Sequence, residues 1–371
     1  MSEPPLFLGL DLAGTGAHPA SWRRADSRAE DLFGAAYWTE AVTRAERLGV
    51  DAVFLADSFG LQPGGAGVTR GRLDAVAIAA RVAPLTRRIG LVPQVPVTHT
   101  EPFHVSKAIA ALDFASLGRA GWEVAVSGTV EEAKAFGRKD IQSAESLWQE
   151  ADEAVEVVTR LWDSWEDGAE IRDVPTGRFI DRDRLHYIDF HDEHFSVKGP
   201  SITPRSPQGQ PIVTVRADDT AATAVAVRRA DLIRVTAPDP AGAAARRTAL
   251  RAAIADAGRD PDTVRVLLDL PVHLADSADQ ARAEVDELDR WAGTVPTTGI
   301  QHVGTVAELD DLLAEIGGSG SADGVVLRPL AVYATLTALR ARPAPTAPPG
   351  TFRDHLALPR PTSRYARGAA L

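Results

Sequence analysis

The chain has 371 residues, of which 44% are hydrophobic and 25% are charged, the balance of an ordinary globular protein. Its net charge of −11 argues against a nucleic-acid surface or an anionic membrane surface, because both need a basic patch. The chain has no cysteine, which excludes a disulfide framework, a thiolate metal site and a cysteine nucleophile.

The N-terminal sequence MSEPPLFLGL lacks a basic segment followed by a long apolar core, so we expect no signal peptide. No apolar run is long enough to span a bilayer, and we expect a cytoplasmic protein. A length of 371 residues is common for one α/β barrel with insertions. We therefore predict a single domain over residues 1–371.

The first third of the chain alternates between short apolar runs and amphipathic segments. The runs predict strands that are buried on both faces, and the spacing of apolar residues between them predicts helices. The predicted strands are residues 6–12, 50–56, 88–95 and 120–126, and the predicted helices are residues 31–48, 72–83 and 102–117.

The alternation changes after residue 127 and resumes at residue 212. Residues 129–136 and 145–165 have helical patterns, and a segment rich in Asp, Arg and Gly follows. The later strands are predicted at 212–215, 231–236, 264–270 and 323–327, and the helices at 221–227, 243–257, 277–288 and 305–316. Eight strands alternating with helices predict a (β/α)8 TIM barrel, an α/β fold, with an insertion at about 129–210 between strands four and five. A Pro-rich arm is predicted at about 343–371.

One continuous stretch carries a family resemblance. Residues 87–122, RRIGLVPQV…THTEPFHVSKAIAALDFASLGRAGW, resemble the central signature of the bacterial-luciferase-like flavin monooxygenases. The branch it resembles oxidises nitrilotriacetate, dibenzothiophene sulfone and long-chain alkanes. The His18-x-x-x-Trp22-Arg23 element, Asp163-Ser164-Trp165 and PRSPQGQP at 204–211 are also similar to the family, and the resemblance runs from residue 8 to about 366.

The resemblance implies an activity and its partners. It implies reduced FMN from a separate flavin reductase, O2, and a small organic substrate bound at the carboxyl ends of the strands. Members of the family associate through helices of the N-terminal half, and the predicted helices at 32–48 and 73–82 have broad apolar faces. We therefore expect a homodimer or a larger homo-oligomer.

The resemblance also assigns roles at the strand ends. It places Asp57, Thr98 and Ser127 at the flavin ring, and His18 near the substrate. Since an ordinary histidine has a pKa of about 6.5, His18 and His99 are candidate proton donors. The alternatives are that Asp57 caps a helix or turn, and that His18 is a loop residue without a role. Because His18 lies in a glycine-rich loop, we expect it to matter for turnover rather than for folding.

The residues that hold the flavin phosphate in the family are replaced here. Trp148 stands at the position of a phosphate-binding tyrosine, and Ala217-Asp218-Asp219 stands at the position of a Gly-Ser-Ser turn. Two desolvated carboxylates would repel a phosphate dianion by several kcal/mol. Arg216 is the one new cation that the sequence places nearby, and it would face the phosphate.

Three functions therefore stay open. The chain is a flavin monooxygenase with a rearranged phosphate site, an enzyme that transfers hydride with a deazaflavin, or a non-catalytic barrel such as a partner subunit. No Gly-x-Gly-x-x-Gly follows a strand, so a built-in nicotinamide site is not supported. The histidines at 186, 191 and 194 lie in a segment rich in acids, which is either a metal site or, as we expect, a solvated charged loop.

Overall fold

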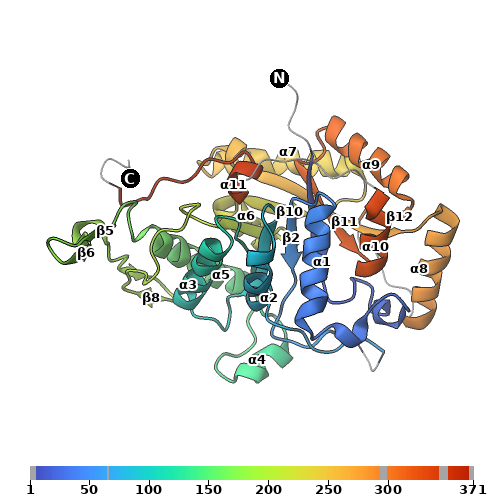
Figure 1. Ribbon diagram of the computed structural model, residues 1–371, viewed down its shortest axis with the longest axis horizontal. Coiled ribbons are helices and arrows are strands. Elements are labelled where there is room, and N and C mark those ends of the chain that lie inside the picture. Colours follow the sequence, from blue (N-terminus) through green and yellow to red (C-terminus); the bar gives the residue numbers. More distant parts are fainter. Residues whose placement is uncertain (1–5, 65–66, 293–298, 342–349, 367–371) are drawn as a thin grey trace.

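The computed structural model describes residues 6–64, 67–292, 299–341 and 350–366. Eight parallel strands form a closed barrel with helices around it, so the predicted TIM barrel is confirmed (Figure 1). In barrel order the strands are β1 (Phe7–Leu12), β2 (Ala52–Leu55), β3 (Gly90–Pro96), β4 (Gly121–Ala125), β9 (Ile212–Arg216), β10 (Leu232–Val235), β11 (Arg265–Leu274) and β13 (Gly324–Pro329). The barrel closes because β13 pairs with β1 and β10 pairs with β11.

The helices cover the outside of the barrel and bury one face each. They are α1 (Ala35–Arg47), α2 (Ala75–Val82), α3 (Pro102–Ala115), α5 (Ala144–Asp163), α6 (Thr220–Arg229), α7 (Pro240–Asp256), α8 (Ala278–Ala292), α9 (Val306–Gly318) and α10 (Val332–Ala338). The apolar faces of α1 and α2, on which the expected oligomer rested, are buried within this chain. Those two faces are therefore not available to a second copy, and the homo-oligomer stays a prediction that light scattering can test. No helix in the described residues has the length and apolarity needed to cross a bilayer.

The segment between β4 and β9 contains one barrel helix and several short elements. The helix α5 packs against α3 and α6, as a helix joining two neighbouring barrel strands does. Its apolar residues recur on one face, and the side chain of Ser143 caps its first turn. The short elements are α4 (Val130–Phe136), β5 (Glu170–Asp173), β6 (Arg178–Ile180), β7 (Phe190–His191) and β8 (Ser196–Val197).

The C-terminal segment closes the amino end of the barrel. Phe352, the first residue of α11 (Phe352–His355), and Leu356, which follows that helix, pack with Phe7 and Phe54 in the barrel interior. A Cβ atom on Gly90 would lie 2.8 Å from the ring of Phe352, so glycine there makes room for the plug. Figure 1 shows α11 and α4 at opposite ends of the barrel, which leaves the strand carboxyl ends on the side of α4.

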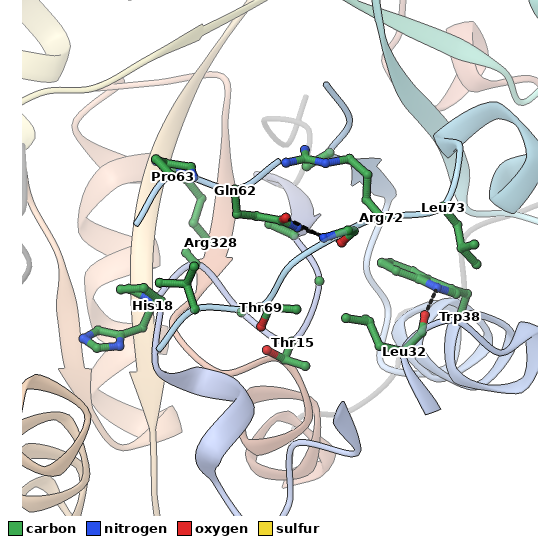
Figure 2. A pocket seen from close by; sticks show the side chains of 18 residues that line it. Thr15, His18, Leu32, Trp38, Gln62, Pro63, Thr69, Arg72, Leu73 and Arg328 are labelled. Atoms are coloured by element: carbon green, nitrogen blue, oxygen red, sulfur yellow. Dashed lines mark hydrogen bonds between the residues drawn. The ribbon is translucent and has the colours of Figure 1, made fainter. Parts of the chain in front are cut away.

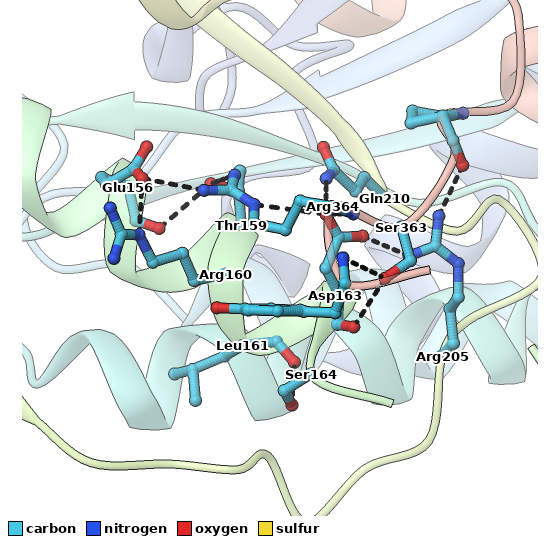
Figure 3. A network of polar contacts seen from close by, with 12 residues as sticks. Glu156, Thr159, Arg160, Leu161, Asp163, Ser164, Arg205, Gln210, Ser363 and Arg364 are labelled. Carbon is cyan, nitrogen blue, oxygen red and sulfur yellow. Dashed lines mark hydrogen bonds and ion pairs between the residues drawn. The ribbon is translucent and has the colours of Figure 1, made fainter. Parts of the chain in front are cut away.

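Polar contacts fix the C-terminal arm to α5 (Figure 3). Asp163 accepts hydrogen bonds from Arg205, Gln210 and Arg364, and its backbone oxygen accepts one from Ser363. The motif at 204–211 and the Asp-Ser-Trp element therefore hold the fold together. The predicted arm includes residues 343–349 and 367–371, which lie outside the described residues.

Candidate active site

An ionic cluster fills the barrel centre at the carboxyl ends of the strands. Arg234 is 1% exposed and binds Asp269 through Nε at 2.8 Å, Glu123 through Nη1 at 2.7 Å, and Asp11 through Nη2 at 2.6 Å. Its guanidinium carbon lies 4.7 Å from the ring centroid of Phe54. Burial lowers the pKa of Arg234, but the three carboxylates outweigh it and raise that pKa well above its ordinary value.

Two further arginines surround this cluster. Arg216 contacts Asp269 at 3.3 Å and Asp218 at 3.2 Å. Arg328 lies 3.9 Å from Asp11 and 4.0 Å from Asp269. Three cations and the three carboxylates that Arg234 holds thus share the barrel centre, and their formal charges balance.

Sequence reasoning gave Asp11, Arg234 and Asp269 no role. Asp11, Arg234 and Asp269 are each the one charged residue within an apolar stretch of a strand buried on both faces. A buried charge must be paired, because desolvation without a partner costs several kcal/mol. The signal was therefore present as charges of opposite sign in strands predicted to share one barrel.

Asp57 has the capping contacts that the sequence left as an alternative. Its carboxylate accepts hydrogen bonds from the backbone N–H groups of Ser58, at 2.8 Å, and Ala75, at 2.9 Å. Burial raises the pKa of this carboxyl. The backbone N–H of Asp57 donates to Gln94, whose amide lies 3.3 Å from Glu123, so the end of β2 is connected to the central cluster.

Thr98 and Ser127 lie together at the ends of β3 and β4. The Oγ1 atom of Thr98 accepts a hydrogen bond of 2.9 Å from the backbone N–H of Ser127. Lys139 donates to the carbonyl of Thr98 at 2.6 Å and pairs with the buried carboxylate of Glu150. The Oγ atom of Ser127 is buried without a hydrogen-bond partner in the described part of the chain, so its hydrogen-bonding capacity is unused there.

His99 packs among aromatic rings beside this pair. Its imidazole stacks on Phe136 of α4 with 4.5 Å between the ring centroids, and Phe59 lies 6.5 Å away. Burial lowers the pKa of His99, and Lys139 lowers it further. A neutral imidazole predominates at pH 7, which weakens the prediction that His99 donates a proton.

His18 is buried, and both of its ring nitrogens contact the protein. Nδ1 accepts a hydrogen bond of 3.1 Å from the backbone N–H of Ala20, and Nε2 lies 3.3 Å from Asp289 on α8. In Figure 2 the imidazole points away from Thr69 and Arg72. His18 is therefore held as part of the loop after β1, which corrects the expectation of a side chain left free by a glycine-rich loop.

A cavity of about 420 Å³ lies beside His18, at the carboxyl ends of β1, β2 and β13 (Figure 2). Its volume is in the range of small-molecule sites. His99, Thr98 and Ser127 do not line it, so the structure does not place the two candidate histidines in one cavity. The side chains that line it include those of Thr15, Leu32, Trp38, Gln62, Thr69, Arg72, Leu73 and Arg328.

The turn at 217–219, where the family holds the flavin phosphate, carries two carboxylates that make contacts within the protein. The Oδ1 atom of Asp219 accepts a hydrogen bond of 2.8 Å from the backbone N–H of Ala222 and caps α6. Asp218 pairs with Arg216, whose other contact is Asp269. The charge of Arg216 is thus already neutralised within the protein.

One sequence expectation at this turn needs correction. Arg216 is not the one nearby cation, because Arg228 and Arg246 line the same groove as Asp218, and Arg246 donates to the carbonyl of Ala217. Trp148 is buried on α5 at a shallow groove between α5 and α6, where its ring fills space and provides no charge.

These residues do not fit the phosphate of FMN. Asp218 and Asp219 would face a phosphate dianion. The backbone N–H of Ala222, in the first turn of α6, already donates to Asp219, and Arg216 is already paired with Asp218. The hydroxyl of Ser127, at the predicted ring end, is by contrast without a hydrogen-bond partner in the described residues. The contact of Thr98 and Ser127 with a flavin ring stays a prediction.

The histidines of the segment between β4 and β9 do not converge on one point. His186 pairs with Glu166 at 2.7 Å and His194 with Glu153 at 2.8 Å, whereas His191 is exposed. Within the described residues no group of three or more His, Asp or Glu side chains is placed to hold a metal ion.

The sequence of this chain is similar to a family model and to several characterised proteins. Residues 15–336 match the family model described as luciferase-like monooxygenase. The chain is 34% identical over 294 residues to N-acetyl-S-(2-succino)cysteine monooxygenase of Bacillus subtilis (strain 168), covering 79% of this chain and 66% of that protein. It is 31% identical over 321 residues to nitrilotriacetate monooxygenase component A of Aminobacter aminovorans, covering 83% and 69%. The chain thus spans about two thirds of the length of these curated relatives.

Solved structures share the fold over nearly the whole chain. EDTA monooxygenase from Chelativorans sp. BNC1 superposes with a TM-score of 0.85 at 20% identity, covering 96% of this chain and 99% of that one. A long-chain alkane monooxygenase superposes with a TM-score of 0.83 at 20% identity, covering 96% of each chain.

Proposed function

The chain belongs to the luciferase-like monooxygenase family, and we propose that it is a monooxygenase acting on a small organic molecule. The observation that carries the proposal is the cavity of about 420 Å³ at the carboxyl ends of β1, β2 and β13. In TIM barrels that end of the strands carries the active site. The relatives named above, which act on nitrilotriacetate and on a succinylated cysteine, support an oxidation of this class.

We propose reduced FMN as a weakly held reactant supplied by a separate flavin reductase, with O2 as the second reactant. Thr98, Ser127 and Asp57, at the ends of three neighbouring strands, are proposed to contact the flavin ring. The paired state of Arg216 and the carboxylates of Asp218 and Asp219 favour a flavin that exchanges over a resident cofactor.

The chain's own residues position the substrate and exclude water. Trp38 and Leu32 form an apolar wall, and the indole N–H of Trp38 is satisfied by the carbonyl of Leu32 at 2.9 Å. His18 fixes the loop after β1 against α8 through Asp289. Trp38 and His18 thus help to shape the cavity with their own hydrogen bonds already made, as a preorganised site requires.

A second function is favoured by the same turn that fails to fit a phosphate. If Asp218 and Asp219 prevent flavin binding altogether, the chain is a non-catalytic barrel that acts as a partner subunit. The ionic cluster around Arg234, whose charges balance, would then serve only to stabilise the carboxyl end of the barrel.

Stopped-flow mixing separates the two functions. Photoreduced FMN is mixed with aerated buffer in the presence of excess protein, and flavin oxidation is followed by absorbance. We expect the protein to change the rate of oxidation in a saturable way. An oxidation rate that is the same with and without protein, at all protein concentrations up to the millimolar range, would favour the subunit.

A further inference from the structure

Two arginines line the cavity beside β1 although the protein as a whole is acidic. The net charge of the chain is −11. None of the described residues that line the cavity is acidic, and its one histidine, His18, accepts a hydrogen bond at Nδ1. Two arginines at one cavity of an anionic protein favour a ligand that carries negative charge.

Arg72 has unused donors. It makes no hydrogen bond with the part of the chain that the structure describes, and its Nε atom is buried. An electrostatic neighbour in that part is Asp57, whose pKa its charge lowers against the larger effect of burial. The backbone before it is fixed, because Gly71 donates to Gln62 at 3.0 Å and accepts from the same side chain at 2.9 Å. Gly71 has a φ of +91°, which a side chain would strain. The loop thus presents Arg72 to the cavity in a defined place (Figure 2).

Arg328 has unused donors as well. It comes from the end of β13, its side chain is 29% exposed, and its Nε atom has no partner among the described residues. Asp11 and Asp269, at 3.9 and 4.0 Å, are too far away for hydrogen bonds. Both carboxylates are held by Arg234 at 3.0 Å or less.

The chemistry of the missing partner follows from these donors. The Nε atoms of Arg72 and Arg328 are themselves buried, so a ligand in the cavity would be met by the terminal Nη groups of these two side chains. A donor left without an acceptor costs about 1–3 kcal/mol, which a ligand with acceptors would recover. A planar guanidinium matches a carboxylate through two parallel hydrogen bonds. The apolar wall of Leu32, Trp38 and Leu73 suits a hydrocarbon body. We propose that this cavity binds an organic carboxylate, with Arg72 and Arg328 as the residues that select it.

The position of the cavity in the barrel argues that this carboxylate belongs to the substrate. In the closed order of eight strands, β9 lies opposite β1. The turn after β9 that corresponds to the phosphate end is therefore across the barrel from Arg72 and Arg328. The assignment rests on the proposed function, because an enzyme is needed for the ligand to be a substrate.

Calorimetry without flavin tests the proposal on the full chain. The probes are 4-phenylbutyrate, its neutral amide 4-phenylbutyramide, and inorganic phosphate. The variants are Arg72→Gln and Arg328→Gln, with Arg81→Gln as the control that removes the same charge from the exposed surface of α2. We expect the acid to bind at least tenfold more tightly than the amide. Each cavity variant should weaken the acid about tenfold, and Arg81→Gln should not change it.

Each outcome bears on one claim. Equal binding of acid and amide, or no loss in Arg72→Gln, would overturn the proposal. That variant removes a guanidinium that makes no hydrogen bond within the described residues, so it should fold. Displacement of the acid by phosphate at similar concentration would also overturn it, since the cavity would then be a general anion site. Because flavin is absent, the stopped-flow experiment can fail while this one succeeds, and the reverse.

Discussion

Arg234 and Asp269 are joined by two hydrogen bonds, of 2.8 Å from Nε and 3.0 Å from Nη2, inside a barrel whose centre excludes water from both side chains. Asp11 and Glu123 accept hydrogen bonds from Nη2 and Nη1 of the same guanidinium. One residue therefore satisfies carboxylates from three strands, β1, β4 and β11. Burial of such a cluster is costly, and removal of the shared partner leaves three buried carboxylates with only the more distant charges of Arg216 and Arg328.

Arg234→Met should lower the free energy of unfolding by about 3–5 kcal/mol, the usual cost of stranding a buried charge. Urea denaturation measures it. Arg282→Met is the matched control, because Arg282 pairs with Asp279 on the surface and such pairs contribute about 0–1 kcal/mol. Arg234→Lys keeps the charge but not the fork of donors and should fall between the two. Similar small losses for Arg234→Met and Arg282→Met would contradict a role for the cluster in stability.

The barrel strands were predictable because each is a short apolar run buried on both faces. Their pairing into a closed barrel followed from the alternation with amphipathic helices. Shorter elements escaped prediction: α10 (Val332–Ala338), α11 (Phe352–His355) and β12 (His302–Gly304) have too few residues for a period to show. Their positions depend on tertiary contacts, such as that of Phe352 with Gly90.

The candidate site was predictable only as a set of strand ends. Thr98 and Ser127 meet because β3 and β4 are neighbours, which topology implies. The cavity itself was not predictable, since Arg72 and Arg328 come from a loop and a strand with no motif in common. The orientation of His18 depends on Asp289 of α8, and no local pattern in the sequence reports that contact.

The carboxylate of Glu156 should make stability depend on acid pH. Burial raises its pKa, but Arg364, Arg160 and Arg229 outweigh this and lower the pKa to about 2, from an ordinary value of 4.5 (Figure 3). A lowered folded-state pKa gives stability that is complete above about pH 5 and is lost as the pH falls toward 2.

Glu156→Gln should therefore reduce the free energy of unfolding by about 1–2 kcal/mol at pH 7, less than the full shift implies because the carboxylate is partly solvated. At pH 3 the difference from the wild type should shrink, because the wild-type unfolded state binds the proton there. Urea midpoints at both pH values measure it, with the exposed Glu30→Gln as control. A difference that is the same at pH 3 and pH 7 would show that Glu156 does not stabilise through its charge.

His18→Ala should lower the melting temperature by several degrees, because it leaves the buried N–H of Ala20 without its acceptor. His18→Asn can supply an amide oxygen close to the position of Nδ1. We expect the Asn variant to recover both the melting temperature and most of the turnover of reduced FMN with O2, as a positioning residue would. Recovery of melting temperature without turnover would instead show that the imidazole itself takes part in proton transfer.

Asp218 and Asp219 should set the affinity for FMN through its phosphate. In the wild type, two carboxylates at the start of α6 and a paired Arg216 oppose a dianion, so FMN should bind in the micromolar range or more weakly, which corresponds to about −8 kcal/mol. The double variant Asp218→Gly, Asp219→Ser removes both negative charges, and the serine can still cap the helix. It should bind FMN at least tenfold more tightly. Arg216→Ala should loosen FMN further, because it leaves Asp218 and Asp269 without that cation.

Riboflavin is the control ligand, since it has the same ring and no phosphate. Anaerobic titration of photoreduced FMN and photoreduced riboflavin into the wild type and both variants measures all six affinities. The double variant should leave riboflavin unchanged, because the repulsion it removes acts only on the phosphate. An equal gain for riboflavin would mean that the substitutions reshape the ring end instead.

Tight FMN binding by the wild type would show that Arg228 and Arg246, which line the same groove, provide a new binding site for the phosphate. Failure of every protein to bind either flavin would favour the partner subunit, and the monooxygenase proposal would be abandoned.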